Sequence, residues 1–132
     1  MRKKIGFIGA GNMGSAMIKG IISNGLAAKD EVIASCHTKE TKERLSGELG
    51  IEMTLDNREA CDADVLFFAV KPVVLPGVAA EVKDVLTTGQ LIISVAAGFD
   101  LKKLHAILGD ELHIVRTMPN TPAMVEIGRA HV

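Results

Sequence analysis

A glycine-rich hexapeptide, Gly9-Ala10-Gly11-Asn12-Met13-Gly14, follows the apolar run 5–8 and precedes a stretch with helical spacing. In a strand–turn–helix setting the first glycine permits a tight turn, and the second, which lacks a Cβ, lets a diphosphate approach the backbone. The free N–H groups and the positive end of the helix dipole then face the phosphates. The hexapeptide therefore predicts a dinucleotide site, although close packing of the helix on the strand would by itself explain Gly14.

The stretch Ser35-Cys36-His37-Thr38-Lys39 follows the second apolar run and bears on which dinucleotide would bind. An NAD site usually has a carboxylate here, about 20 residues after the glycines, which bonds the ribose 2′-hydroxyl. In this stretch the first carboxylate is Glu40, beyond the expected position. Hydroxyl groups and Lys39 suit a 2′-phosphate, so we expect NADP(H) in preference to NAD(H). The competing interpretation is a solvated loop in which Lys39 only begins a helix.

Three further loops follow later apolar runs. Ala69-Val70-Lys71-Pro72 would lay backbone against the coenzyme, or is only a turn that ends a strand. The small residues of Ser94-Val95-Ala96-Ala97-Gly98 would leave room for a nicotinamide ring, or reflect ordinary packing. The stiff loop 116–122 would bring the polar groups of Asn120 and Thr121 near the nicotinamide, on the substrate side, or is a rigid exit to another domain.

Other catalytic and metal-binding motifs are not found in the sequence. There is no nucleophile elbow with a Ser, His and Asp set, and no phosphate loop with Lys-Ser or Lys-Thr. Cys36 and Cys61 have no metal-ligand spacing, so no metal is expected. His105 and His113 fall within a predicted helix and strand and are interpreted as structural. We therefore assign no catalytic acid or base.

The elements that must position these loops alternate along the chain. Apolar runs predict strands, and amphipathic stretches between them predict helices. We expect strands at 5–8, 31–35, 51–53, 65–70, 91–95 and 112–115, and helices at 13–24, 39–49, 56–63, 100–108 and, beginning near residue 75, up to 86. This alternation predicts an α/β fold, a Rossmann-type doubly wound parallel sheet of order 3-2-1-4-5-6 in a three-layer α/β/α arrangement. The loops after the strands would then gather at one edge of the sheet.

Composition limits the class of protein. The 132 residues suit one domain, and 48% hydrophobic with 23% charged residues are ordinary for a globular chain. A net charge of −1 gives no basic excess for nucleic acid, and no apolar run reaches the ~18 residues of a membrane span. Two cysteines make a poor disulfide framework, and the short N-terminal apolar run is not a signal peptide. We expect a cytoplasmic protein.

Four blocks of this sequence closely resemble pyrroline-5-carboxylate reductase: 5–14, 64–72, 94–98 and Arg116-Thr117-Met118-Pro119-Asn120-Thr121-Pro122-Ala123. They occur in family order, and the resemblance covers residues 4 to about 125. It implies reduction of 1-pyrroline-5-carboxylate to L-proline by hydride transfer from NAD(P)H. It also implies coenzyme contacts at Ile8 through Met13, Ser35, Asn57, Ala69 through Pro72 and Ala96 through Gly98.

The resemblance also implies a domain division. Residues 1–123 would be the NAD(P)-binding domain, and 124–132 a C-terminal stub or tail. Family members continue into a helical domain that forms the homo-oligomer and much of the substrate pocket, which is absent from this chain, so the isolated chain should bind NADPH with little turnover. Two alternatives stay open: another NAD(P)-dependent reductase of the β-hydroxyacid dehydrogenase type, and a non-catalytic dinucleotide-binding or sensing module.

Overall fold

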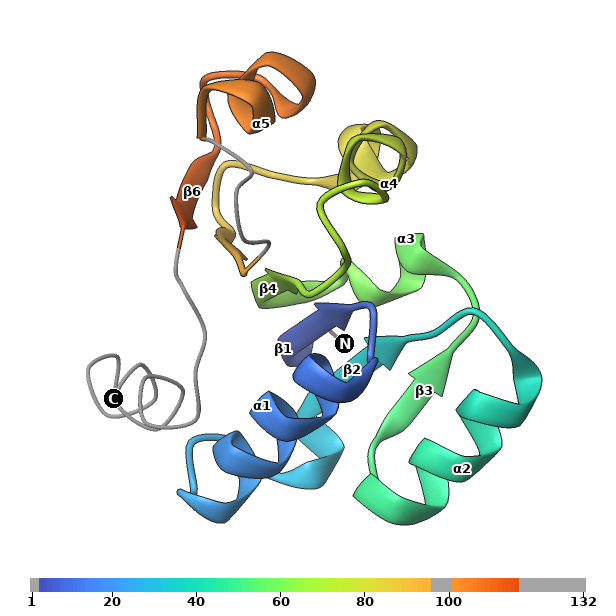
Figure 1. The fold of residues 1–132 in the computed structure, drawn as a ribbon. Coiled ribbons are helices and arrows are strands. Elements are labelled where there is room, and N and C mark those ends of the chain that lie inside the picture. Colours follow the sequence, from blue (N-terminus) through green and yellow to red (C-terminus); the bar gives the residue numbers. More distant parts are fainter. Residues whose placement is uncertain (1–2, 96–100, 117–132) are drawn as a thin grey trace.

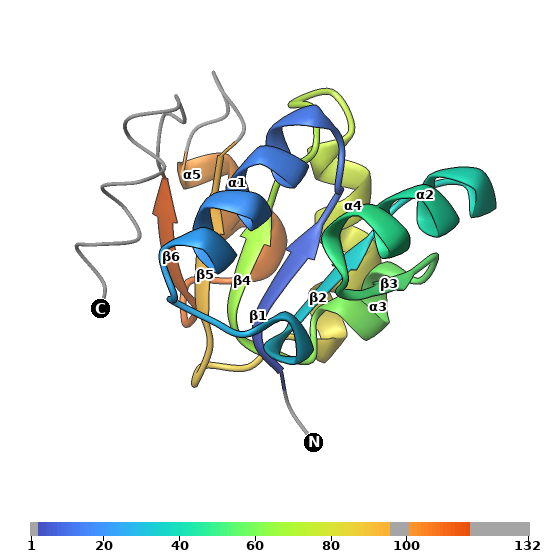
Figure 2. The same ribbon diagram turned by 90° about the horizontal axis from the view of Figure 1, so that it is seen from below.

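One parallel sheet of six strands organises the computed structural model, which describes residues 3–95 and 101–116, with only the backbone at residue 12. The strands run in the order β3-β2-β1-β4-β5-β6 (Figure 2). Every neighbouring pair is parallel, so each connection crosses over through a helix or turn. The predicted fold class and strand order are therefore confirmed. The strands are β1 (Lys3–Ile8), β2 (Val32–Ser35), β3 (Glu52–Thr54), β4 (Ala63–Phe68), β5 (Leu91–Ser94) and β6 (His113–Arg116).

Helices cover both faces of this sheet (Figure 1). Helices α1 and α2 lie on one face, and α3, α4 and α5 lie on the other. The α-helices are α1 (Asn12–Ser23), α2 (Lys39–Leu49), α3 (Asn57–Ala60), α4 (Leu75–Val82) and α5 (Leu101–Leu108), and two 3₁₀ turns are η1 (Lys29–Glu31) and η2 (Lys83–Val85). None of the helices in the described ranges combines the length and apolarity needed to cross a bilayer.

Each face of the sheet carries its own hydrophobic core, because successive strand side chains point to opposite faces. Phe7 and Phe67 stack with ring centroids 4.6 Å apart in the core under α1 and α2. Phe68 and Leu66 pack with Leu75 of α4 in the core on the opposite face. Burial on both faces explains why the central strands are almost wholly apolar.

Several predicted boundaries differ from the observed ones. The strand expected from residue 31 begins at Val32, because Glu31 belongs to η1 and its carboxylate accepts a hydrogen bond from the Ala28 N–H at 2.8 Å. The strand expected over 65–70 begins at Ala63 and ends at Phe68. The helix expected up to 86 divides into α4 and η2, and α3 ends at residue 60 instead of 63. The start of the helix expected at residue 100 lies outside the described residues.

Candidate functional site

A side chain would clash at one position in the turn after β1 and at one position in the first turn of α1. Gly9 has φ +90°, and a Cβ there would lie 2.6 Å from Val70 Cγ1 and 2.9 Å from the Ala69 carbonyl oxygen. A Cβ on Gly14 would lie 2.5 Å from the Gly9 carbonyl oxygen. Helix α1 therefore begins in direct contact with the turn, which is the close packing expected of Gly14.

Gly11 differs from these two glycines because its missing Cβ faces open space, with no atom within 4 Å. Gly11 is the N-cap of α1, and its carbonyl accepts the first helical hydrogen bond from the Ser15 N–H at 2.8 Å. Helical geometry leaves the N–H groups of residues 12–14 without intrahelical acceptors. Among the described side chains none caps this end of α1, and the first turn has no acidic residue. Open space beside free N–H groups and a positive dipole end is an arrangement that accepts an anion.

A groove of about 630 Å³ begins at this turn and runs between α1 and α2, which is within the usual size of a coenzyme pocket. Three cationic side chains reach it, Lys19, Arg44 and Lys71, against one carboxylate, Glu48. Lys19 Nζ lies 3.1 Å from the Glu48 carboxylate, so this ion pair links α1 to α2, and Arg44 Nη1 lies 3.9 Å from the same carboxylate within α2. The lining residues are Gly9, Ala10, Gly11, Ser15, Ala16, Lys19, Cys36, His37, Thr41, Arg44, Leu45, Glu48, Ala69, Val70, Lys71 and Val74. The groove's charge excess suits phosphate groups.

The residues expected to hold a 2′-phosphate occupy different positions. His37 lines the groove, whereas Thr38 caps α2 by accepting a hydrogen bond from the Thr41 N–H at 3.2 Å. Lys39 is exposed as the first residue of α2, and it is not among the described residues that line the groove. The α2 cation in the lining is Arg44, which the sequence reasoning missed. A signal was present, because residues 41, 44, 45 and 48 share one helical face.

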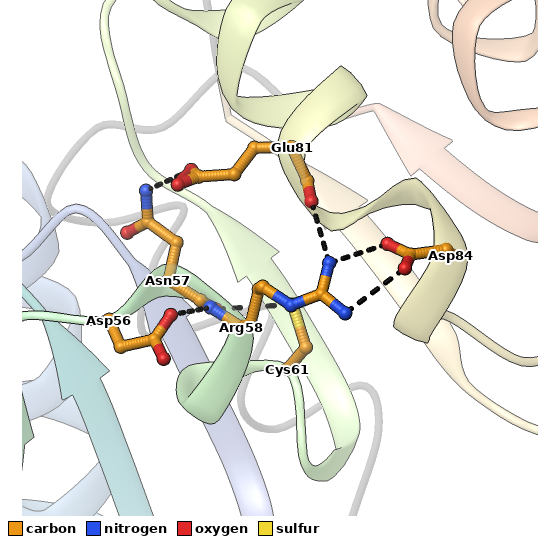
Figure 3. A network of polar contacts seen from close by, with 6 residues as sticks. All are labelled: Asp56, Asn57, Arg58, Cys61, Glu81 and Asp84. Carbon is orange, nitrogen blue, oxygen red and sulfur yellow. Dashed lines mark hydrogen bonds and ion pairs between the residues drawn. The ribbon is translucent and has the colours of Figure 1, made fainter.

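Ser35 supports the glycine turn from inside the protein. Its side chain is fully buried; its hydroxyl accepts a hydrogen bond from the Gly9 N–H at 3.2 Å, and its carbonyl accepts one from the Ala10 N–H at 2.8 Å. The same hydroxyl donates to Asn57 Oδ1 at 2.7 Å. Asn57, half-buried at the start of α3, in turn donates from Nδ2 to Glu81 at 2.8 Å (Figure 3). The Ser35 hydroxyl is thus bonded within the protein, and its contact with a coenzyme stays a prediction.

Both cysteines are free and buried. Burial raises the pKa of the Cys36 thiol, and it raises the pKa of the Cys61 thiol to about 12. Both side chains are therefore protonated thiols near neutral pH, although Cys36 lines the groove. Within residues 3–95 and 101–116, no three His, Cys, Asp or Glu side chains lie together as metal ligands would.

The remaining predicted site residues fall into three groups: those that line the groove, those that do not, and those outside the described residues. Ala69, Val70 and Lys71 line the groove, whereas Pro72 is exposed and Ile8 is fully buried. The expected contacts at Ala96, Ala97, Gly98, Asn120 and Thr121, and the tail 124–132, lie outside the described residues. At the C-terminal end of β5, the hydroxyl of Ser94 is buried and has no hydrogen-bond partner among the described residues.

The chain is similar to a protein family and to curated proteins of known name. The family described as NADP oxidoreductase coenzyme F420-dependent matches residues 4–98. The pyrroline-5-carboxylate reductase of Escherichia coli (strain K12) is 38% identical over an alignment that covers 100% of this chain and 49% of that protein. The chain therefore spans about half the length of the curated relatives it matches.

Solved structures of reductases with the same name are also similar to this chain. A pyrroline-5-carboxylate reductase from Coxiella burnetii superposes with a TM-score of 0.85 at 35% identity, over 95% of this chain and 47% of that one. The pyrroline carboxylate reductase of Plasmodium falciparum, solved with NADP bound, superposes with a TM-score of 0.79 at 31% identity, over 93% and 44%. These similarities agree with the resemblance found in the sequence blocks.

Proposed function

Because this chain belongs to the family described as NADP oxidoreductase coenzyme F420-dependent, we propose that it is the coenzyme-binding half of a pyrroline-5-carboxylate reductase. One observation carries the proposal: the free N–H groups at the start of α1, beside the open space at Gly11, lie at the mouth of a cationic groove. Relatives that are similar in sequence and in structure bear the reductase's name. The activity is proposed for a protein of the relatives' length, of which this chain spans about half.

The residues present fit a nicotinamide dinucleotide. The backbone from Gly11 to Gly14 would hold the diphosphate, since the Gly11 position leaves room for it. The loop 69–71 lines the same groove, and Ser35 bonds the turn from inside the protein. The chemistry that the coenzyme supplies is hydride transfer to the C=N carbon of 1-pyrroline-5-carboxylate, which gives L-proline. The task of the described residues is to bind and orient the coenzyme, and we assign no proton donor among them.

The proposal includes a preference for NADP(H), with NAD(H) as the weaker ligand. A carboxylate that would repel a 2′-phosphate is missing from 35–39, while Lys19, Arg44 and Thr41 line the groove. We assign the 2′-phosphate to Arg44 in place of Lys39. Arg44→Gln should weaken NADPH binding by about tenfold to a hundredfold, the loss of one charge-assisted contact, and leave NADH binding unchanged. Lys39→Gln is the matched control, since Lys39 lies on the same helix and outside the lining.

Titration of the chain with NADPH and NADH, followed by nicotinamide fluorescence, tests these points. Equal affinity for both would contradict the NADP(H) preference, and an effect of Lys39→Gln without one of Arg44→Gln would move the 2′-phosphate to the loop 36–39. The substrate is tested separately in the full-length protein by NADPH oxidation that depends on 1-pyrroline-5-carboxylate. Turnover of a β-hydroxyacid in its place would favour the related dehydrogenases, and binding without any turnover would favour a sensing module.

The proposal also covers partners and setting. The partner is the small molecule 1-pyrroline-5-carboxylate, whose pocket would be completed by the half of the relatives that this chain does not span. That half would also form the homo-oligomer. A cytoplasmic setting and the lack of a nucleic-acid or membrane partner follow the net charge of −1 and the low cysteine content.

A further inference from the structure

A relay of three hydrogen bonds connects the glycine turn to the far helix layer. The Gly9 N–H donates to Ser35 Oγ at 3.2 Å, and Ser35 Oγ donates to Asn57 Oδ1 at 2.7 Å. Asn57 Nδ2 donates to Glu81 Oε1 at 2.8 Å. The relay thus joins the turn after β1, the end of β2, α3 and α4, which are separated by up to 72 positions in the sequence. Its outer end, Asn57 beside Glu81, is drawn in Figure 3.

The direction of every bond in the relay is determined by its two ends. A backbone N–H can only donate and a carboxylate can only accept. Ser35 Oγ must therefore accept from Gly9, and Asn57 must direct its Nδ2 outward to Glu81. Asn57 then presents Oδ1 to the serine, and because an amide oxygen can only accept, it takes the serine's single proton. The exposed carboxylate at one end consequently selects the orientation of the half-buried amide and of the buried hydroxyl.

We propose that Glu81 is a positioning residue for the phosphate-binding turn. By holding Nδ2 of Asn57, it keeps Oδ1 toward Ser35 as the acceptor for the serine proton, and this bond fixes the hydroxyl with an oxygen lone pair toward the Gly9 N–H. A donor at position 81 would favour the inverted Asn57 amide. The buried serine would then face two donors, Asn57 Nδ2 and the Gly9 N–H, and its own proton would lose its acceptor. Only the identity of the ligand, a coenzyme phosphate, rests on the proposed function.

A purely structural role for Glu81 predicts a different pattern. Helix α3 is also joined to α4 and η2 by Arg58, which donates to the Glu81 backbone carbonyl in α4 at 3.1 Å and to the Asp84 carboxylate in η2 at 2.6 Å and 3.0 Å (Figure 3). These bonds do not involve the Glu81 side chain, so they survive its substitution. Asp84→Asn weakens the same helix contact outside the relay and is therefore the matched control.

The test measures hydrogen exchange of the Gly9 amide by NMR in the coenzyme-free chain, together with NADPH affinity. Glu81→Gln should behave as the native chain, because a glutamine oxygen can accept from Asn57. Glu81→Lys should raise Gly9 exchange about tenfold and weaken NADPH binding about three- to tenfold, the scale of one net hydrogen bond. Asp84→Asn should leave Gly9 exchange unchanged. Glu81→Ala, which removes the acceptor without adding a donor, should raise Gly9 exchange about threefold and replaces Glu81→Lys if that variant does not fold.

Native Gly9 exchange in both Glu81→Lys and Glu81→Ala would overturn the proposal. So would a rise shared equally by all amides or by Asp84→Asn, because that pattern reports general loosening of the fold. If the native chain binds no NADPH, the proposed function fails on its own, and Gly9 exchange alone still decides the relay.

Discussion

Substitution of Gly11 by alanine should separate coenzyme binding from folding. No atom lies within 4 Å of the Cβ position, and the backbone there, at φ −82° and ψ −159°, is open to alanine. Glycine is a better N-cap than alanine, whereas alanine has less conformational freedom in the unfolded chain, so the two effects oppose each other. Gly11→Ala should therefore change the free energy of unfolding by less than about 1 kcal/mol. The added methyl group would occupy the space proposed for the diphosphate. Loss of two charge-assisted hydrogen bonds, at about 1.5–3 kcal/mol each, corresponds to at least a hundredfold weaker NADPH binding.

Urea denaturation and a fluorescence titration with NADPH measure the two effects in the same preparation. Gly20→Ala is the matched control, because Gly20 lies on the same helix and its Cβ position is equally open. That variant should stabilise the chain by about 0.5–1 kcal/mol and bind NADPH as the native chain does. Native NADPH affinity in Gly11→Ala would refute the reasoning, since it would mean that no ligand approaches the backbone at this position.

Three further perturbations have outcomes that follow from the structure. Gly14→Ala should lower the free energy of unfolding by about 1–3 kcal/mol in urea denaturation, because its Cβ would lie 2.5 Å from the Gly9 carbonyl oxygen; an unchanged value would contradict the packing described. Burial raises the pKa of Cys61 from 9.0 to about 12, so the unfolded chain loses this proton first and the stability should fall as pH rises from 9 to 12. Cys61→Ala should remove that part of the pH dependence, and an identical profile in both chains would count against it. The Arg58 guanidinium hydrogen-bonded to Asp84 lowers the pKa of that carboxyl, so its contribution to stability is present above the ordinary carboxyl range and is lost as pH falls through the lowered value. The stability difference between the native chain and Asp84→Asn should therefore shrink toward low pH, and a constant difference would contradict this ion pair.

The fold was largely predictable, because its signals are local and repeated. Each strand is an apolar run and each helix has its own spacing, so the alternation alone indicates the sheet and its order. The errors fall at the ends of helices and strands, where side chains compete for the backbone hydrogen bonds that would extend the element. Glu31, for example, bonds the Ala28 N–H and turns the backbone into η1 before β2 can begin.

The site was predictable only where one segment forms it. The glycine turn is such a segment, and the spacing of its glycines is enough to predict the backbone conformation. The role of Ser35 could not be predicted, because its buried hydroxyl is bonded to Gly9 and Asn57, which belong to different parts of the sequence. Arg44 is an intermediate case, since helical periodicity places it beside Thr41, and only the packing of α2 against the groove makes that face relevant.

Amide chemical shifts of the ¹⁵N-labelled chain, followed as NADPH is added, test the central claim most directly. We expect the largest changes on the N–H groups of residues 11–14, where the diphosphate would bind. Saturable binding with changes confined to other residues, such as those of the smaller hollow lined by Lys83, Leu86, Thr88 and residues 108–112, would contradict the proposed site, as would a lack of any change.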